Sequence, residues 1–296
     1  MTARLKTFFI RFRRYQKERF PVIVLVISLI PAVLSSAAVV SAESLWPEIL
    51  VALVASIGYL LHIRIIDEHR DFTHDNEHYR TRPIQAGIIE KADLMRLDIF
   101  VVVILLALAV TASTNALIAM LVMLSYSYVA GKEFFLGEKL RKYFFLYNCL
   151  NLVQMLLMQI FVYIVLAESV SITHLIVVHF LFTTTGTAIF EWLRKVKLPG
   201  QDGTGKDTYT WHLGFPAALW IGFALLTANA LFFLWVMTFI STSVLWVWIA
   251  LLATVAGFLW TLAHHVRRNK QSEQMLQLSI LVQYGILNLI IYFVGT

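Results

Sequence analysis

Nine long apolar stretches run through this chain of 296 residues and limit what it can fold into. Each is long enough to cross the hydrocarbon core of a bilayer as a helix. Charged residues make up only 14% of the chain, well below the share typical of a soluble domain. The sequence therefore predicts an all-α polytopic membrane protein. The predicted spans are 20–40, 46–66, 94–112, 115–130, 144–167, 172–193, 213–236, 244–265 and 275–294.

The distribution of Lys and Arg supports this count of spans. All 24 of these residues lie in the N-terminal segment or in the loops and flanks that follow spans 2, 4, 6 and 8. The loops on the opposite side carry none. Such an asymmetry predicts a cytoplasmic N-terminus and an outside C-terminus. We expect one nine-transmembrane-helix bundle that forms a single transmembrane domain over residues 1–296.

The net charge of +6 follows from this topology and does not indicate nucleic-acid binding. Residues 1–19 interleave basic and aromatic side chains, a pattern that predicts an interfacial helix lying on anionic membrane lipid. Cys149 is the one cysteine and lies within a span, which excludes a disulfide framework and a cysteine metal site.

An acidic run follows span 2 within a predicted cytoplasmic loop, 67–93. On a helix its four carboxylates would lie within about 100° of one another. Carboxylates spaced i, i+4 repel, so a cation is expected to neutralise them, and magnesium is the natural candidate. The alternative is an acidic turn paired with Arg64, Arg70, Arg80 and Arg82. The four acidic residues are Asp67, Glu68, Asp71 and Asp75.

A second predicted cytoplasmic loop, 194–212, follows span 6. Glu191 ends its span much as Asp67 ends span 2, and Arg194 and Lys195 follow it. A basic loop facing an acidic one could hold a metal–diphosphate, while the alternative is a Gly/Pro-rich surface turn. At the end of span 4, Tyr128 and Lys132 form an i, i+4 pair. Such a pair can bind phosphate, although both residue types also favour membrane interfaces.

Together these motifs resemble the UbiA superfamily of intramembrane prenyltransferases. That family has nine transmembrane helices and an N-D-x-x-D-x-x-x-D motif after helix 2. The four acidic residues of this chain stand in register with that motif, with Asp67 and Glu68 replacing Asn and Asp. Tyr128 and Lys132 resemble the tyrosine–lysine pair of helix 4. The downstream R-x-R-P-type segment and its glycine are matched by Arg80, Arg82, Pro83 and Gly87.

The family's second motif, D-x-x-x-D after helix 6, fits poorly. Glu191 can stand at its first position, but Lys195 falls at its second. An ammonium cannot ligate a metal, so a second magnesium is in doubt. Either Lys195 neutralises diphosphate directly, or Asp202 or Asp207 supplies the missing ligand.

The resemblance implies a Mg²⁺-dependent transfer of an isoprenyl group from a prenyl diphosphate to a lipophilic, aromatic acceptor. It assigns the metal to Asp67, Glu68, Asp71 and Asp75, with Glu191 as a weaker ligand and Asp202 as a further candidate. It assigns the diphosphate to Arg80, Arg82, Tyr128, Lys132, Arg194 and Lys195. Polar residues inside spans could line an acceptor pocket or join helices by hydrogen bonds. These are Asn151, Gln154 and Thr187.

Other functions stay open. Within the family, terpene cyclisation and phosphoribosyl transfer to a polyprenyl phosphate are alternatives. Outside it, His69, His74 and His78 could indicate a di-iron enzyme, but no H-x-x-H-H box is present. A transporter or scaffold role is weakly supported, because few ionisable groups lie inside the spans. We expect a bacterial cytoplasmic-membrane protein with its active site on the cytoplasmic side.

Overall fold

The computed structural model describes residues 2–40, 46–167, 171–200 and 206–296. Within these ranges the chain is helical and contains no strand. Nine described helices are long and apolar enough to cross a membrane, which confirms the predicted fold class and an integral, multi-pass protein. They are α2 (Val22–Val39), α3 (Trp46–Arg70), α5 (Lys91–Ala112), α6 (Thr114–Gly131), α8 (Phe144–Leu166), α9 (His174–Arg194), α11 (Phe215–Ile240), α12 (Leu245–Arg267) and α13 (Lys270–Gly295).

Five further elements complete the described chain, and α4 and α10 among them lie on the two loops that the sequence singled out. They are α1 (Thr2–Arg19), α4 (Phe72–His78), η1 (Glu133–Phe135), α7 (Glu138–Arg141) and α10 (Tyr209–Leu213). Polar caps begin several of the helices, as for α9, where the Thr173 hydroxyl accepts a hydrogen bond from the amide of Ile176. Predicted and observed spans differ by at most five residues at an end, the largest difference being the start of α13.

The chain divides into two compact units. The first contains Met1–Leu29 and Trp46–Glu168, and the second contains Ile30–Leu45 and Ser169–Thr296. The helix α2 therefore contributes residues to both. That residues 1–296 form one transmembrane domain stays a prediction, and each unit is described by itself.

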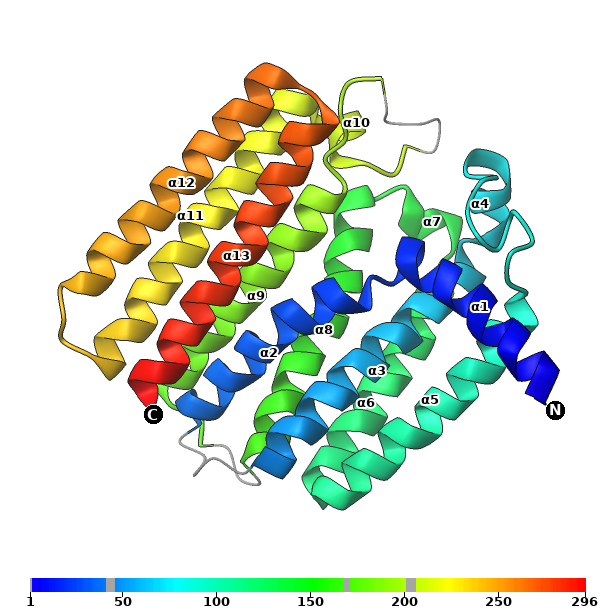
Figure 1. Cartoon of the computed structure of the whole chain (residues 1–296), viewed down its shortest axis with the longest axis horizontal. Helices are drawn as coiled ribbons and strands as arrows, with labels where there is room; N and C mark the ends of the chain where they lie inside the picture. The colour runs from blue at the N-terminus through cyan, green and yellow to red at the C-terminus, as the bar shows by residue number, and fades with distance from the viewer. Residues whose placement is uncertain (1, 41–45, 168–170, 201–205) are drawn as a thin grey trace. The chain divides into compact units, whose positions relative to one another are not determined.

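In the first unit, α3 packs against α5, α6 and α8 (Figure 1). A buried polar group joins three of these helices. His62 Nδ1 lies 2.8 Å from Asp98 Oδ1, and His62 Nε2 lies 3.0 Å from Ser127 Oγ. Ionisable groups inside a bundle are tolerated when they pair in this way. Close to the end of α3, Gly131 of α6 leaves no room for a side chain, because a Cβ there would lie 2.5 Å from Ile66 Cγ2.

The helix α1 also belongs to the first unit and packs through its aromatic side. Tyr15 is buried in an apolar cluster with Ile65, Ile84 and Leu94, and Phe8 and Phe12 pack against that cluster. Arg13, Arg14 and Lys17 are exposed on this helix. The arrangement agrees with the predicted amphipathic segment, although contact with lipid stays a prediction.

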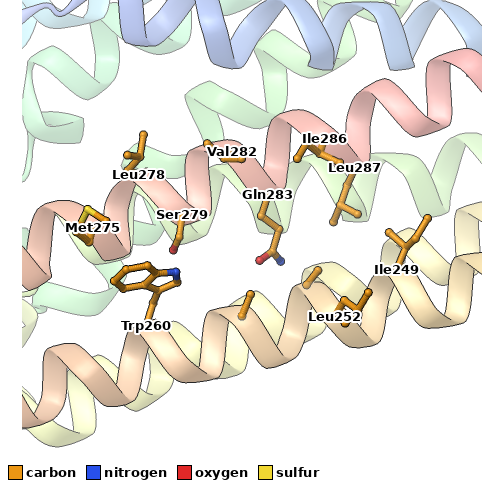
Figure 2. A pocket seen from close by; sticks show the side chains of 12 residues that line it. Ile249, Leu252, Trp260, Met275, Leu278, Ser279, Val282, Gln283, Ile286 and Leu287 are labelled. Carbon is orange, nitrogen blue, oxygen red and sulfur yellow. The ribbon is translucent and has the colours of Figure 1, made fainter.

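In the second unit, α9, α11, α12 and α13 pack together around a core that includes Phe182 and Phe233. Tyr284 stacks on Phe182 with ring centroids 5.9 Å apart. An apolar groove of about 490 Å³ lies between α12 and α13 (Figure 2). Its lining includes Trp260 and Gln283 but none of the motif residues. Gln283 is a buried polar exception, since its amide nitrogen has no hydrogen-bond partner in the described part of the chain.

Candidate active site

The acidic run spans the junction between α3 and α4. The helix α3 ends at Arg70 and α4 begins at Phe72, with Asp71 as the N-cap residue between them. Helical hydrogen bonds nevertheless continue through the junction. The amide of Asp71 donates to Asp67 O at 2.9 Å, and the amide of Asp75 donates to Asp71 O at 2.8 Å. The i, i+4 spacing expected from the sequence is therefore kept.

The four carboxylates do not converge on one point, because they divide into two pairs. Glu68 and Asp75 form the inner pair, each with 2% of its surface exposed. Arg19 Nε donates to Glu68 Oε1 at 2.8 Å, and Arg64 Nη2 donates to the same atom at 2.5 Å. Asp75 pairs with Arg82 and lies 3.9 Å from Arg19 Nη2. Guanidinium groups therefore already neutralise both inner carboxylates, and the role of Glu68 and Asp75 as metal ligands stays a prediction.

Asp67 and Asp71 form the outer pair and share one guanidinium. Arg70 Nη2 lies 2.8 Å from Asp67 Oδ1 and 3.0 Å from Asp71 Oδ2. Arg70 Nε donates to Asp71 Oδ1 at 3.0 Å, so the bond to Asp71 is bidentate. The side chains of Asp67 and Asp71 are 27% and 32% exposed, whereas that of Arg70 is 8% exposed.

Two side chains of α8 complete the surroundings of Arg70. Its Nη1 donates to Asn151 Oδ1 at 3.3 Å, and its Cζ lies 5.6 Å from the ring centroid of Tyr147. Asn151, predicted for an acceptor pocket, thus contacts a motif arginine instead. Gln154 is buried and donates to Asn151 O, while in the second unit Thr187 donates to Thr183 O of its own helix. Of these hydrogen bonds only that between Asn151 and Arg70 joins two helices, and an acceptor pocket stays a prediction.

Asp71 and Asp75 have pKa values shifted in opposite directions. Burial alone would raise the pKa of Asp71, but the hydrogen bonds and charge of Arg70, together with Arg141, outweigh it and lower that pKa. Burial raises the pKa of Asp75, and the charges of Asp71 and Glu68 add to this effect against the opposing pair with Arg82. The outer carboxylate is therefore held ionised more strongly than the inner one.

The loop after α6 adds further charge to the first unit. Arg141 Nη2 lies 3.7 Å from Asp71 Oδ1 and pairs with Glu133. Burial opposes the charge of Arg141, but its hydrogen bond to Glu133 outweighs this and raises its pKa. Glu133, Phe134 and Phe135 have φ values of 52°, 55° and 58°. Non-glycine residues in this left-handed region are strained, and such strain is concentrated at functional sites.

The predicted diphosphate ligands of the first unit differ in their availability. Arg80 and Lys132 are exposed, and Tyr128 is 58% exposed. Lys132 follows the last residue of α6, with its Nζ 5.9 Å from the Tyr128 ring centroid. Arg82 is occupied by Asp75 and stacks over Tyr79 at 3.8 Å. Arg80 and Lys132 are thus the better candidates, and all four assignments stay predictions.

In the second unit, Glu191 lies at the end of α9 with two cations. Arg194 donates to both of its carboxylate oxygens, at 2.8 and 3.1 Å, and Lys195 Nζ lies 3.3 Å from Oε1. Tyr209 closes the following loop, since its amide donates to Lys195 O and its ring stacks on Trp192 with centroids 3.8 Å apart. Asp202 lies outside the described residues. The roles of Glu191, Arg194 and Lys195 in binding stay predictions.

Arg64, Arg70 and Arg82 pair with carboxylates of the run, as the alternative of an acidic turn expected, while Arg80 donates to Asn76 O. Glu68 and Asp75 are buried, however, so the turn is not fully solvated. Sequence reasoning missed Arg19 and Arg141. Arg19 lies 49 residues from its partner Glu68, and no local pattern links them. Arg141 lies in the basic loop after span 4, where only its charge marked it.

No profile of a known protein family and no curated protein matches the sequence. Solved structures do match, and they define a class of UbiA-type membrane folds. A UbiA homologue from Aeropyrum pernix K1 has a TM-score of 0.69 and 14% identity over 90% of this chain and 97% of that one. Digeranylgeranylglyceryl phosphate synthase has a TM-score of 0.63 and 13% identity over 99% of both chains.

A third structure is a UbiA homologue from Archaeoglobus fulgidus bound to DMAPP and Mg²⁺, with a TM-score of 0.59 and 14% identity over 95% of this chain and 97% of that one. This chain therefore has the fold of the UbiA superfamily. The resemblance noted in the sequence is confirmed at the level of the fold.

Proposed function

We propose that this chain is an intramembrane prenyltransferase that moves an isoprenyl group from a prenyl diphosphate to a lipophilic acceptor. One observation carries the proposal. In a UbiA-type fold, the outer pair Asp67 and Asp71 lies partly exposed at the end of α3, with Arg70 and Arg141 in contact. The A. fulgidus homologue with this fold binds DMAPP and Mg²⁺.

The donor set at this point fits a magnesium ion through the outer pair alone. Among the described residues no three Asp, Glu, His or Cys side chains come together as a preformed metal site. Magnesium, however, needs only one or two carboxylates, because waters and phosphate oxygens complete its shell. Asp67 and Asp71 would hold it, while Glu68 and Asp75 are occupied by arginines. A bound magnesium would offset charge on the departing diphosphate.

Cationic side chains of the first unit would bind and orient the diphosphate. Arginine binds phosphate oxygens through two parallel hydrogen bonds, and lysine acts as a point charge. In the reaction, the allylic C–O bond breaks and its electron pair leaves with the diphosphate. The allylic carbon then bonds to a nucleophilic atom of the acceptor, which loses a proton to solvent. Arg80, Arg141 and Lys132 are the residues proposed to hold the leaving group.

Product analysis by mass spectrometry tests the proposal. Purified protein would be incubated with Mg²⁺ and geranyl, farnesyl or geranylgeranyl diphosphate, with and without a membrane-lipid extract. Prenylated adducts that require the extract and vanish in Asp71→Ala support a transferase. Hydrocarbon or alcohol products without extract would indicate a cyclase. Undiminished turnover in a folded Asp71→Ala protein would overturn the assignment.

A further inference from the structure

Arg70 occupies the space between the two carboxylates that would hold the metal. We propose that Arg70 guards this site, so that a divalent cation binds Asp67 and Asp71 only together with a diphosphate that takes over the guanidinium. The inference rests on the proposed function and adds an order of binding to it. Arg70 thus makes metal binding at Asp67 and Asp71 conditional on the diphosphate.

The guanidinium of Arg70 lies in a site whose side chains hold a positive charge. Both oxygens of Asp71 accept hydrogen bonds from it, and Asp67 Oδ1 lies 2.8 Å from its Nη2. Asn151 and the ring of Tyr147 contact the same guanidinium. The side chain of Arg70 is 8% exposed, which is less than that of Asp67 or Asp71. When substrate is absent, the guanidinium of Arg70 therefore already pairs with the outer carboxylates.

Charge makes this guanidinium a barrier to a metal ion. A divalent cation placed between Asp67 and Asp71 would meet a fixed positive charge within contact distance, and the two would repel. It would also have to displace the two charge-assisted hydrogen bonds to Asp71 and the ion pair with Asp67. Arg141, 3.7 Å from Asp71, adds to the repulsion. Without diphosphate, a divalent cation should therefore bind only weakly between Asp67 and Asp71.

A diphosphate changes the balance because it offers the guanidinium an equivalent partner. Phosphate oxygens match the planar fork of arginine as carboxylate oxygens do. Once Arg70 turns to a phosphate, Asp67 and Asp71 lose its positive charge, and the repulsion within this i, i+4 pair favours a metal. Coupling between two ligands is reciprocal, so each would strengthen the binding of the other.

The chain offers a matched control for Arg70. Arg96 pairs with Asp93 at i, i+3, the same spacing as Arg70 and Asp67, with a distance of 3.2 Å. The side chain of Arg96 is 78% exposed, and the position that corresponds to Asp71 holds Leu97, which is not a carboxylate. Removing Arg96 should therefore not create a metal site.

The test measures Mn²⁺ binding by electron paramagnetic resonance on the purified full chain in detergent, first without phosphate. Arg70→Gln should bind Mn²⁺ about tenfold or more tightly than the wild type. Arg96→Gln should match the wild type, and Arg70→Gln with Asp71→Asn should lose the gain. Wild-type binding as tight as that of Arg70→Gln, or no gain in a folded Arg70→Gln, would overturn the proposal. Arg70→Lys, which keeps the charge without the fork, should show a smaller gain and serves if Arg70→Gln does not fold.

A second arm adds inorganic pyrophosphate as the probe and measures protein-bound manganese and phosphorus after equilibrium dialysis. The wild type should now retain one manganese for each pyrophosphate, that is, two phosphorus atoms per manganese. Failure to do so would overturn the conditional binding even if Arg70→Gln gains affinity. Because neither arm uses a prenyl chain, the proposed function can fail separately. Prenyl products from a wild type that binds Mn²⁺ tightly alone would refute the guard and leave the transferase standing.

Discussion

The ends of α3 and α9 share a pattern but differ in sign. Each carries a carboxylate with an arginine three residues on: Asp67 with Arg70, and Glu191 with Arg194. Four residues on, α3 has Asp71 whereas α9 has Lys195. One guanidinium is thus shared by two carboxylates at α3, and one carboxylate carries two cations at α9. A single position therefore gives one end an excess of negative charge and the other an excess of positive charge.

The largest expected difference between the ends of α3 and α9 is in their effect on enzyme activity. Asp71→Asn should lower prenyl transfer by about 100-fold or more, because it removes a metal donor and the bidentate partner of Arg70. Glu191→Gln should cost about tenfold or less, because Glu191 is already neutralised twice and its loss leaves both cations for phosphate. Initial rates by mass spectrometry check both, with unfolding curves as the control. Equal losses would mean that the two ends play equivalent roles.

The free energy of unfolding should depend more on the buried Glu68 than on the partly exposed Glu191. Glu68→Ala leaves Arg19 and Arg64 without their shared partner and should lower the free energy of unfolding by about 3 kcal/mol. Glu191→Ala breaks a pair whose arginine is 59% exposed and should cost under about 1 kcal/mol. Denaturant unfolding in detergent measures both values. A Glu191→Ala protein as unstable as Glu68→Ala would show that α9 depends on its pair equally.

The pH dependence of stability should distinguish the outer pair from the inner pair at α3. The pKa of Asp75 is raised in the fold, so its protonation stabilises the folded state. The advantage of the wild type over Asp75→Asn should grow as the pH falls from 7 toward about 4.

The pKa of Asp71 is lowered, so its contribution is complete above its unfolded pKa of about 3.9 and is lost only below it. The difference between the wild type and Asp71→Asn should therefore stay constant from pH 7 to pH 5. Unfolding at several pH values checks both trends, and a reversed order would show that Arg70 does not control Asp71.

The smallest expected effect comes from glycines that pack beside each end. A Cβ at Gly131 would lie 2.5 Å from Ile66 Cγ2, and one at Gly222 would lie 2.8 Å from Leu193 Cδ2. Isoleucine is stiff near the backbone, whereas the tip of leucine can turn away. Gly131→Ala should cost about 1–2 kcal/mol, and Gly222→Ala should be near neutral because alanine favours a helix. Thermal unfolding of both variants tests the order.

The nine spans were predictable because apolar length and the one-sided distribution of Lys and Arg depend only on local sequence. The motif residues were also found locally. Their pairing was harder to predict: the run divides because Glu68 and Asp75 are held by Arg19, a contact over 49 residues in the first case. The contacts of Arg70 with Asn151 and of Asp71 with Arg141 likewise come from segments whose approach no spacing rule reveals.

The contact between Arg19 and Glu68 makes the first helix part of the surroundings of the acidic run, which matters when a shortened protein is prepared. A shortened protein that starts at Phe20 would keep all nine predicted crossings and every motif residue. It would still lose a charge that Glu68 and Asp75 both use, in a place shielded from water. Glu68 would then keep Arg64, and Asp75 would keep Arg82, but the acidic run would have one cation fewer than in the full chain. Metal titrations on the shortened protein would therefore not describe the site of the full chain.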